Sequence, residues 1–369
     1  MERRSCCICE CKINNFFSME MPTKLFCTKY PISDKSLLSF AQCEVCNTIQ
    51  LDRLIPLNIL YSNSHNYNSV GHVWKTYFDR FVSMIENIII DKTILEIGDP
   101  SGKIANQCKN FNKWIIVEPN KNLTINFNKK IEFVERFFND DFSINDKIDI
   151  IVHSHLLEHI YEPNIFLKKC YDILTNDGEM IFGVPNMEHI GKNEIAPCLG
   201  IFFEHTIFLN QENISYLLKK NGFQILQIVY HESHSLLYHV KKVNNFQNEK
   251  VVVFNYGKQF FITLDKYKKF VDSCNDFLEN KQNKSVYIFG ASYNTQFLLS
   301  LGLNVDKIDG IIDNCFDKHG HFLYGYNLQI FPPNILIGRD SCVILKNGYY
   351  SDEIRNQLLT IKSSLTIFT

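Results

Sequence analysis

Thr93-Ile-Leu-Glu-Ile-Gly-Asp-Pro-Ser-Gly102 is the stretch of sequence that decides the fold. Residues 93–97 predict a buried strand, and the two glycines after them predict a tight turn. A second predicted strand, 113–117, ends before Glu118, which lies 22 residues after Glu96. In a βαβ unit such a turn lets a ligand approach the backbone, and an acid at the tip of the next strand can bind the hydroxyls of a ribose. The sequence therefore predicts a ligand that carries adenosine.

The spacing of this turn points to one class of cofactor. Glu96, Gly98 and Gly102 follow a Glu-x-Gly-x-x-x-Gly pattern, whereas dinucleotide loops follow Gly-x-Gly-x-x-Gly. The pattern favours S-adenosylmethionine over NAD, although Pro100 removes one amide donor from the turn. We expect the cofactor to contact residues that end the predicted strands or follow them: Glu96, Gly98, Asp99, Gly102, Glu118, Pro119, Phe138 and His155.

Strands alternate with helices from residue 93 onward, which predicts an α/β fold built on a doubly wound, mostly parallel sheet. Further strands are expected at 131–134, 148–152, 179–184, 223–230 and 235–241. Helices are expected at 73–88, 164–174 and 214–221. Gly178 is expected to close the second of these helices as a left-handed cap. The last two strands follow each other directly and predict an antiparallel edge.

The N-terminus is rich in cysteine. Seven of the 13 cysteines lie in the first 46 residues, and two Cys-x-x-Cys pairs are formed by Cys6, Cys9, Cys43 and Cys46. Two such pairs can surround one tetrahedral Zn²⁺ with four thiolates, which leaves no open position for catalysis. A structural zinc site is therefore expected on these four residues. Cys7 and Cys11 offer an alternative first pair, and reduced cysteines without a metal are the remaining possibility.

A second strand–turn–helix unit begins at Ser285-Val-Tyr-Ile-Phe-Gly290, after a helix expected at 264–282. A further strand follows and ends near Asp313. The unit predicts a second, Rossmann-like α/β domain. We expect a zinc-binding domain at 1–58, a helical connector at 59–90, the cofactor-binding domain at 91–245 and the C-terminal domain at 246–369.

The composition excludes several classes of function. Hydrophobic residues make up 45% of the 369 positions, and the formal net charge is −2. A nucleic-acid-binding protein would need a basic face, and a membrane span would need about 20 consecutive apolar residues. Met1-Glu-Arg-Arg4 is not followed by the apolar stretch of a signal peptide. We expect a cytoplasmic protein that contacts neither nucleic acid nor membrane, as a monomer or weak homodimer.

Histidines gather where the predicted sheet ends. Eight of the twelve lie between residues 153 and 239. His155 follows the fourth strand, at the edge where doubly wound folds bind ligands, and is expected to face the cofactor or the substrate. His159 could equally be a packed or capping residue, and His231 and His234 are further candidates.

Taken in order, these motifs resemble the deoxysugar C-methyltransferases that act on nucleotide-linked 4-ketosugars. The resemblance covers nearly the whole chain and rests on these segments: Cys43-Glu-Val-Cys46 with Gln50-Leu51, Leu95-Glu-Ile-Gly98, Val117-Glu118-Pro119, His155-Leu-Leu-Glu-His159-Ile160, Phe203-Glu204-His205, Gly290-Ala-Ser292, Asp313 and Lys318-His-Gly320. That family combines a four-cysteine zinc domain, a class I methyltransferase domain and a C-terminal Rossmann-like domain. The resemblance implies the same architecture here, with S-adenosylmethionine and structural zinc as cofactors and a nucleotide-linked deoxysugar as substrate.

The resemblance also implies a mechanism. A ketone at C4 of the sugar acidifies the proton on C3, and a base removes that proton to give an enolate whose carbon attacks the methyl group. The matched motif makes His205 the base, with Glu204 beside it to orient or tune it. Tyr67 lies where the family has a tyrosine on the substrate side, and His155 is a further catalytic candidate.

The chain departs from the family around the acceptor. Phe202 and Phe203 stand where the family has Tyr and His, and His155 stands where it has Asn. The segment 231–236 matches a His-Gly-Gly-Ser-Leu motif only loosely. These changes leave open an oxygen or nitrogen acceptor on a sugar or surface-glycan precursor. They also leave open a non-catalytic nucleotide-binding homologue and an NAD-linked enzyme that uses the Gly290 turn.

Overall fold

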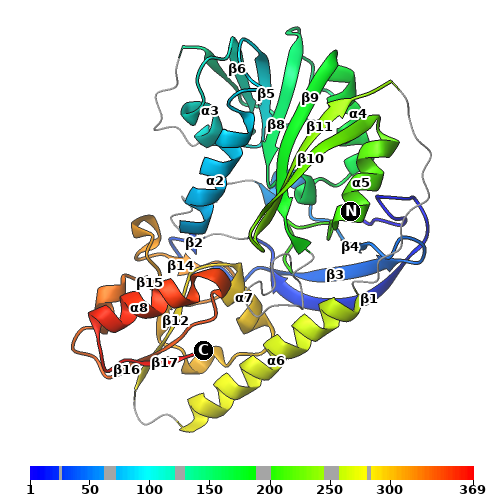
Figure 1. The fold of residues 1–369 in the computed structure, drawn as a ribbon. Coiled ribbons are helices and arrows are strands. Elements are labelled where there is room, and N and C mark those ends of the chain that lie inside the picture. Colours follow the sequence, from blue (N-terminus) through cyan, green and yellow to red (C-terminus); the bar gives the residue numbers. More distant parts are fainter. Residues whose placement is uncertain (25–26, 62–71, 121–128, 188–200, 245–256, 281–283) are drawn as a thin grey trace.

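The computed structural model describes residues 1–24, 27–61, 72–120, 129–187, 201–244, 257–280 and 284–369 (Figure 1). Within these residues the strands form one seven-stranded, one five-stranded, one three-stranded and one two-stranded sheet. None of the helices in this part of the chain has the length and apolar character needed to cross a membrane.

The seven-stranded sheet, here called the central sheet because it comes from the middle of the sequence, forms the upper part of the molecule in Figure 1. Its strands are β5 (Thr93–Ile97), β6 (Lys113–Val117), β7 (Ile131–Val134), β8 (Ile148–Ser154), β9 (Leu174–Pro185), β10 (Phe223–His231) and β11 (Ser235–Lys242). Their order is β10-β11-β9-β8-β5-β6-β7, and all neighbours are parallel except those of β11. The predicted α/β fold is confirmed. The antiparallel strand lies second from the edge, because β10 pairs with its outer side.

Helices cover both faces of this sheet. Its helices are α2 (His72–Ile85), α3 (Lys103–Gln107), α4 (Pro163–Ile173) and α5 (Gln211–Lys220). Ile94 and Trp114 pack in the core that contains α2 and α3, whereas Leu95 and Ile115 pack in the core that contains α4 and α5. Successive residues of a strand point to opposite faces, so a strand covered on both sides is apolar at nearly every position.

The end of α4 differs from the prediction. Gly178 is not a left-handed cap, because the helix stops at Ile173 and β9 already begins at Leu174. The register of β8 and β9 shifts between the pairs Ile148–Leu174 and Ile150–Glu179, so Gly178 lies in an irregular part of the strand. A Cβ atom at Gly178 would lie 2.8 Å from the side chain of Leu174, which explains a glycine there without a positive φ.

The N-terminal part forms an antiparallel sheet under the central one. Its elements are β1 (Ile13–Pro22), β2 (Cys27–Thr28), β3 (Lys35–Cys43), β4 (Ile49–Leu51) and α1 (Leu57–Leu60), and the sheet order is β1-β3-β4. One predicted domain boundary, residue 58, falls inside α1. Strand β2 belongs to the two-stranded sheet and pairs with β14 (Phe322–Leu323), from the other end of the chain.

The C-terminal part is a second α/β unit. Its elements are α6 (Gly257–Asn280), β12 (Ser285–Phe289), α7 (Tyr293–Ser300), β13 (Gly310–Ile312), β15 (Ile330–Phe331), β16 (Ser341–Ile344), α8 (Ser351–Ile361) and β17 (Thr366–Phe368). The five strands are all parallel in the order β15-β13-β12-β16-β17. Short 3-10 helices lie at 157–159, 305–307, 316–318, 333–336 and 348–350.

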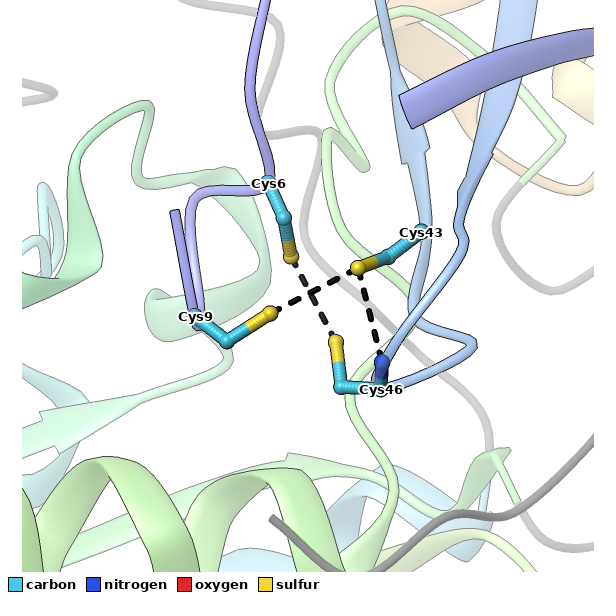
Figure 2. A group of neighbouring side chains, drawn as sticks. All are labelled: Cys6, Cys9, Cys43 and Cys46. Carbon is cyan, nitrogen blue, oxygen red and sulfur yellow. Dashed lines mark hydrogen bonds between the residues drawn. The ribbon is translucent and has the colours of Figure 1, made fainter. Parts of the chain in front are cut away.

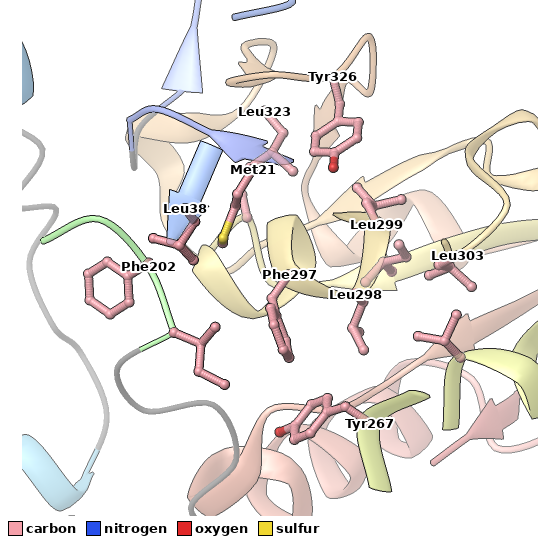
Figure 3. Close-up of a cluster of buried hydrophobic side chains, with 14 of the residues drawn as sticks. Met21, Leu38, Phe202, Tyr267, Phe297, Leu298, Leu299, Leu303, Leu323 and Tyr326 are labelled. Carbon is pink, nitrogen blue, oxygen red and sulfur yellow. The ribbon is translucent and has the colours of Figure 1, made fainter. Parts of the chain in front are cut away.

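The two ends of the chain share one hydrophobic core. Met21 and Leu38 of the N-terminal sheet belong to the same buried cluster as Phe297 of α7 and Leu323 of β14 (Figure 3). Phe202, from the segment between β9 and α5, belongs to the same cluster (Figure 3). The first and last parts of the sequence therefore fold against each other, next to the edge of the central domain.

Candidate active site

A cavity of about 400 Å³ lies at the carboxyl edge of the central sheet, where β5, β6 and β8 end. Because β6 lies on one side of β5 and β8 on the other, the strand order reverses here, and open α/β sheets bind ligands at such a reversal. Five predicted cofactor residues line the cavity: Gly98, Glu118, Pro119, Phe138 and His155. Three others, Glu96, Asp99 and Gly102, are not among the residues that line it.

The glycine turn is held by its own side chains. The carboxylate of Asp99 accepts hydrogen bonds from the backbone N–H groups of Ser101 and Lys103, both at 2.7 Å. Gly98 and Gly102 have φ values of 84° and 61°, which favour glycine. A Cβ atom at Gly98 would lie 3.1 Å from the side chain of Leu156. Asp99 and Gly102 thus shape the turn, and Gly98 brings its backbone to the cavity.

Glu96 is buried beneath the turn, with 1% of its surface exposed. The indole N–H of Trp114 donates a hydrogen bond to Glu96 Oε2 at 2.7 Å. Burial raises the pKa of this carboxyl well above its usual value. Glu96 therefore joins β5 to β6 and does not reach the cavity wall.

Glu118 faces the cavity from the end of β6. Its Oε1 accepts a hydrogen bond from the backbone N–H of Asn120 at 2.8 Å, which orients the carboxylate at the tip of the strand. A carboxylate in this place can accept hydrogen bonds from both hydroxyls of a ribose. The position of Glu118 is compatible with the predicted contact to a ribose, which stays a prediction.

His155 lines the cavity, and each of its ring nitrogens lies near a side-chain oxygen. Nε2 lies 2.9 Å from Ser235 Oγ, and Nδ1 lies 3.4 Å from Glu158 Oε1. The residue has a φ of 49°, and its backbone N–H bonds to Gly183 at 2.8 Å. Burial lowers the pKa of the imidazole to about 3, so the ring is neutral at ordinary pH. The geometry suits an anchoring role more than direct proton transfer.

The predicted base lies just behind the cavity wall. His205 is buried, and its ring centre lies 4.9 Å from that of His159 in an edge-to-face arrangement. His159 and Glu204 line the cavity themselves, and His159 Nδ1 lies 3.9 Å from Glu204 Oε2. The hydroxyl of Tyr61 lies 3.1 Å from the same nitrogen of His159. Burial lowers the pKa of His205 well below its usual value, so the ring is neutral at ordinary pH.

Two residues of this group, His159 and Tyr61, were not predicted as site residues. His159 sits in a short 3-10 helix directly after β8, and the Leu-Glu-His motif there was the available signal. Tyr61 comes from the N-terminal part of the chain, and no local pattern marks it. The predicted catalytic residue Tyr67 lies outside the described residues.

Phe202 links the base to the C-terminal unit. Its ring centre lies 4.3 Å from that of His205 and 4.9 Å from that of Tyr293, at the start of α7. Phe202 and Phe203 are both buried. Because they are phenylalanines, neither side chain has a polar group to offer to a substrate. Where the resembled family has Tyr and His, this chain therefore has two phenylalanines that pack in the interior.

The four predicted cysteines meet in one place (Figure 2). The Sγ atoms of Cys6 and Cys46 lie 3.5 Å apart, as do those of Cys9 and Cys43, and all four fit within 4.8 Å. Four thiolates around Zn²⁺ at 2.3 Å would be about 3.8 Å apart, so the donors fit a tetrahedral zinc ion. Cys43 Sγ also accepts from the backbone N–H of Cys46 at 3.4 Å. The alternative ligands Cys7 and Cys11 are not part of the cluster.

Family models match most of the chain. Residues 72–228 match a methyltransferase domain, and residues 225–368 match a C-methyltransferase C-terminal domain. The chain is a methyltransferase. The second match covers the five-stranded C-terminal unit of the enzyme.

The methyltransferase is also similar to solved structures. The N-methyltransferase NodS from Bradyrhizobium japonicum WM9 is 12% identical, with a TM-score of 0.36 over 47% of this chain and 99% of that chain. A S-adenosylmethionine-dependent methyltransferase from Clostridium acetobutylicum ATCC 824 is 14% identical, with a TM-score of 0.36 over 48% of this chain and 94% of that chain. No curated protein matches the enzyme.

Proposed function

We propose that the enzyme methylates a carbon atom of a nucleotide-linked ketodeoxysugar, with His205 as the base. The group of His159, Glu204 and His205 at the wall of the cavity carries this proposal. The match of residues 225–368 to a C-methyltransferase C-terminal domain supports carbon as the acceptor.

The cofactor would bind along the glycine turn. Gly98 offers a backbone without a side chain, Glu118 offers a carboxylate for the ribose, and Phe138 offers an aromatic wall. These groups suit S-adenosylmethionine, which supplies an electrophilic methyl group when bound. Pro119 and His155 line the same space and would complete the contacts.

The chain's own residues would then perform the proton transfer. A ketone next to the acceptor carbon makes its C–H bond acidic, and the neutral imidazole of His205 removes that proton. The electron pair of the broken C–H bond forms the enolate, whose carbon takes the methyl group. Glu204, which lines the cavity, would orient the histidines through its contact with His159.

Two experiments test the acceptor and the base. A panel of nucleotide-linked 4-ketosugars carrying deuterium at C3 is incubated with S-adenosylmethionine, and the products are read by mass spectrometry and NMR. Carbon transfer at C3 removes the deuterium, and a product that keeps it would reject the enolate route. His205→Asn should abolish turnover while binding S-adenosylhomocysteine as tightly as the parent enzyme does. Retained turnover would reject His205 as the base.

A heteroatom acceptor is the second candidate, and Phe202 is the observation that favours it. This ring packs between His205 and Tyr293, where the resembled family has a tyrosine. A site without that hydroxyl has one group fewer to hold a ketosugar. In this case His205 would take the proton of a hydroxyl or amine on a sugar or surface-glycan precursor, and deuterium at C3 would stay.

We also propose that Cys6, Cys9, Cys43 and Cys46 bind one structural zinc ion. Their spacing and burial support a closed tetrahedral site. Metal analysis of the purified enzyme should give about one equivalent of zinc per chain. Cys43→Ser should lose it, whereas Cys11→Ser, outside the cluster, should keep it. A folded parent enzyme without zinc would refute the proposal.

A further inference from the structure

The carboxylate of Glu158 lies behind the wall of the cavity, with 2% of the residue exposed. Within the described residues neither of its oxygens has a hydrogen-bond donor. Two imidazole nitrogens lie within 4.0 Å of Oε1, His155 Nδ1 at 3.4 Å and His159 Nε2 at 3.9 Å. No lysine or arginine in the described part of the chain forms an ion pair with it. Among the side chains that the structure places, only protonated histidines can bring a positive charge to this carboxylate.

A third imidazole completes the arrangement. A carboxylate oxygen of Glu158 and one ring nitrogen each of His159 and His205 lie within 4.8 Å of one another. His159 turns Nδ1 to the hydroxyl of Tyr61, which leaves Nε2 directed at Glu158. His155 binds Ser235 through Nε2 and so leaves Nδ1 for the same carboxylate. Tyr61 and Ser235 thus orient the rings of His159 and His155 so that the second nitrogen of each ring faces Glu158.

Burial pushes these groups toward their neutral forms. It raises the pKa of Glu158 to about 7 and lowers that of His205 well below its usual value. A base with a strongly lowered pKa holds a proton poorly. A carboxylate within 4 to 6 Å of an imidazole favours the protonated ring and raises its pKa by roughly 1 to 3 units.

We propose that Glu158 is the counter-ion of the His159–His205 pair and acts as a positioning residue for proton removal. The proposal rests on the proposed function for the role of His205. The proton leaves the acceptor carbon and bonds to the imidazole, and its electron pair stays on the carbon. Glu158 neither takes nor gives a proton in this step. In its ionised form, Glu158 carries a negative charge that offsets the positive charge that appears on the ring.

The test compares Glu158→Gln with Glu179→Gln. Glutamine keeps the shape of the side chain and removes the charge. Glu179 provides a matched control, because its Oε2 contacts His239 Nε2 at 2.7 Å on β9 and β11, and neither residue lines the cavity. Histidine ring signals are followed by NMR across pH in the full-length enzyme. S-adenosylhomocysteine affinity is measured by calorimetry.

Glu158→Gln should lower the pKa of His205 by about one unit or more, with unchanged cofactor affinity. Glu179→Gln should leave the pKa of His205 unchanged. With an active ketosugar, kcat of Glu158→Gln should fall tenfold or more and its acid limb should move to lower pH, while Glu158→Asp should recover part of the loss. An unchanged pKa of His205 in Glu158→Gln would overturn the proposal. So would a second equivalent of metal, bound by the parent enzyme and lost in Glu158→Gln, because the three side chains would then be metal ligands.

The NMR and calorimetry need no sugar, so their outcome does not depend on the identity of the acceptor. A lowered pKa of His205 in Glu158→Gln supports the counter-ion even if every ketosugar fails as a substrate. That second result would count against the proposed function alone.

Discussion

Gly183 should not tolerate alanine, because a buried tyrosine occupies the space of the new methyl group. An ideal Cβ atom on Gly183 would lie 2.0 Å from the hydroxyl oxygen of Tyr77, on α2. Tyr77 is fully buried and packs against the rings of His155 and His231, so its ring cannot swing away. Its hydroxyl lies 2.8 Å from Ser154 Oγ, and this hydrogen bond would break when the ring is displaced.

The size of the effect follows from these contacts. Overpacking a well-packed core costs about 1 to 3 kcal/mol. Losing the bond between Tyr77 and Ser154 adds about 1 kcal/mol. Gly183→Ala should therefore lower the free energy of unfolding by about 2 to 4 kcal/mol. The change would be measured by urea denaturation followed by circular dichroism.

A second substitution isolates the cause. Tyr77→Phe removes the hydroxyl, and the nearest ring atom, Cζ, lies 3.1 Å from the position that the new methyl group takes. The methyl group should then fit after a small shift, so Gly183→Ala should cost at least about 1 kcal/mol less in Tyr77→Phe than in the parent enzyme. Equal costs in the two backgrounds would refute the steric explanation.

Two further predictions concern buried basic groups. His153 is fully buried, stacks on Phe182 and has its pKa lowered from 6.5 to about 3 by burial. The stability gained from its neutral form is present above the unfolded pKa and is lost as pH falls toward 3. The parent enzyme should therefore lose about 2 kcal/mol relative to His153→Phe between pH 7 and pH 5, measured by urea denaturation, and parallel stability curves would contradict this. Arg3 is buried and donates to the carbonyl oxygens of Leu51, Tyr161 and Thr206, so Arg3→Ala should cost about 2 to 4 kcal/mol in the same assay. The exposed Arg4→Ala is the control, and equal losses would show that the guanidinium contacts do not stabilise the fold.

Strands that are buried on both faces can be predicted from the sequence, because nearly all of their residues are apolar. β5 and β6 are such strands and have the predicted bounds 93–97 and 113–117. The edge strand β7 also has its predicted bounds, 131–134, although only Ile131 of its residues is buried. The long strands β1 and β3 escape such a prediction, because β1 mixes exposed polar with apolar positions. Their core partners also lie far away in the sequence, in α7 and β14.

The same distinction applies to the site. The turn at Gly98 and the acid at Glu118 can be placed at one edge of the sheet, because βαβ topology brings the ends of parallel strands together. The sequence does not predict how the imidazole rings of His155 and His159 are oriented, although both residues lie at or just after the end of β8. Their ring orientations depend on Ser235 and Tyr61, which come from different parts of the chain.

The shared core of the two chain ends has a consequence for biosynthesis. Thr28 pairs with Phe322, and Met21 and Leu38 are buried beside Phe297 and Leu323. At roughly 5 to 20 residues per second, a ribosome needs about 15 to 60 s to pass from the first member of the pair to the second. During that time the apolar side of the N-terminal sheet has been made and its C-terminal partners have not. The nascent chain therefore carries a hydrophobic surface that a chaperone could bind until translation is almost complete.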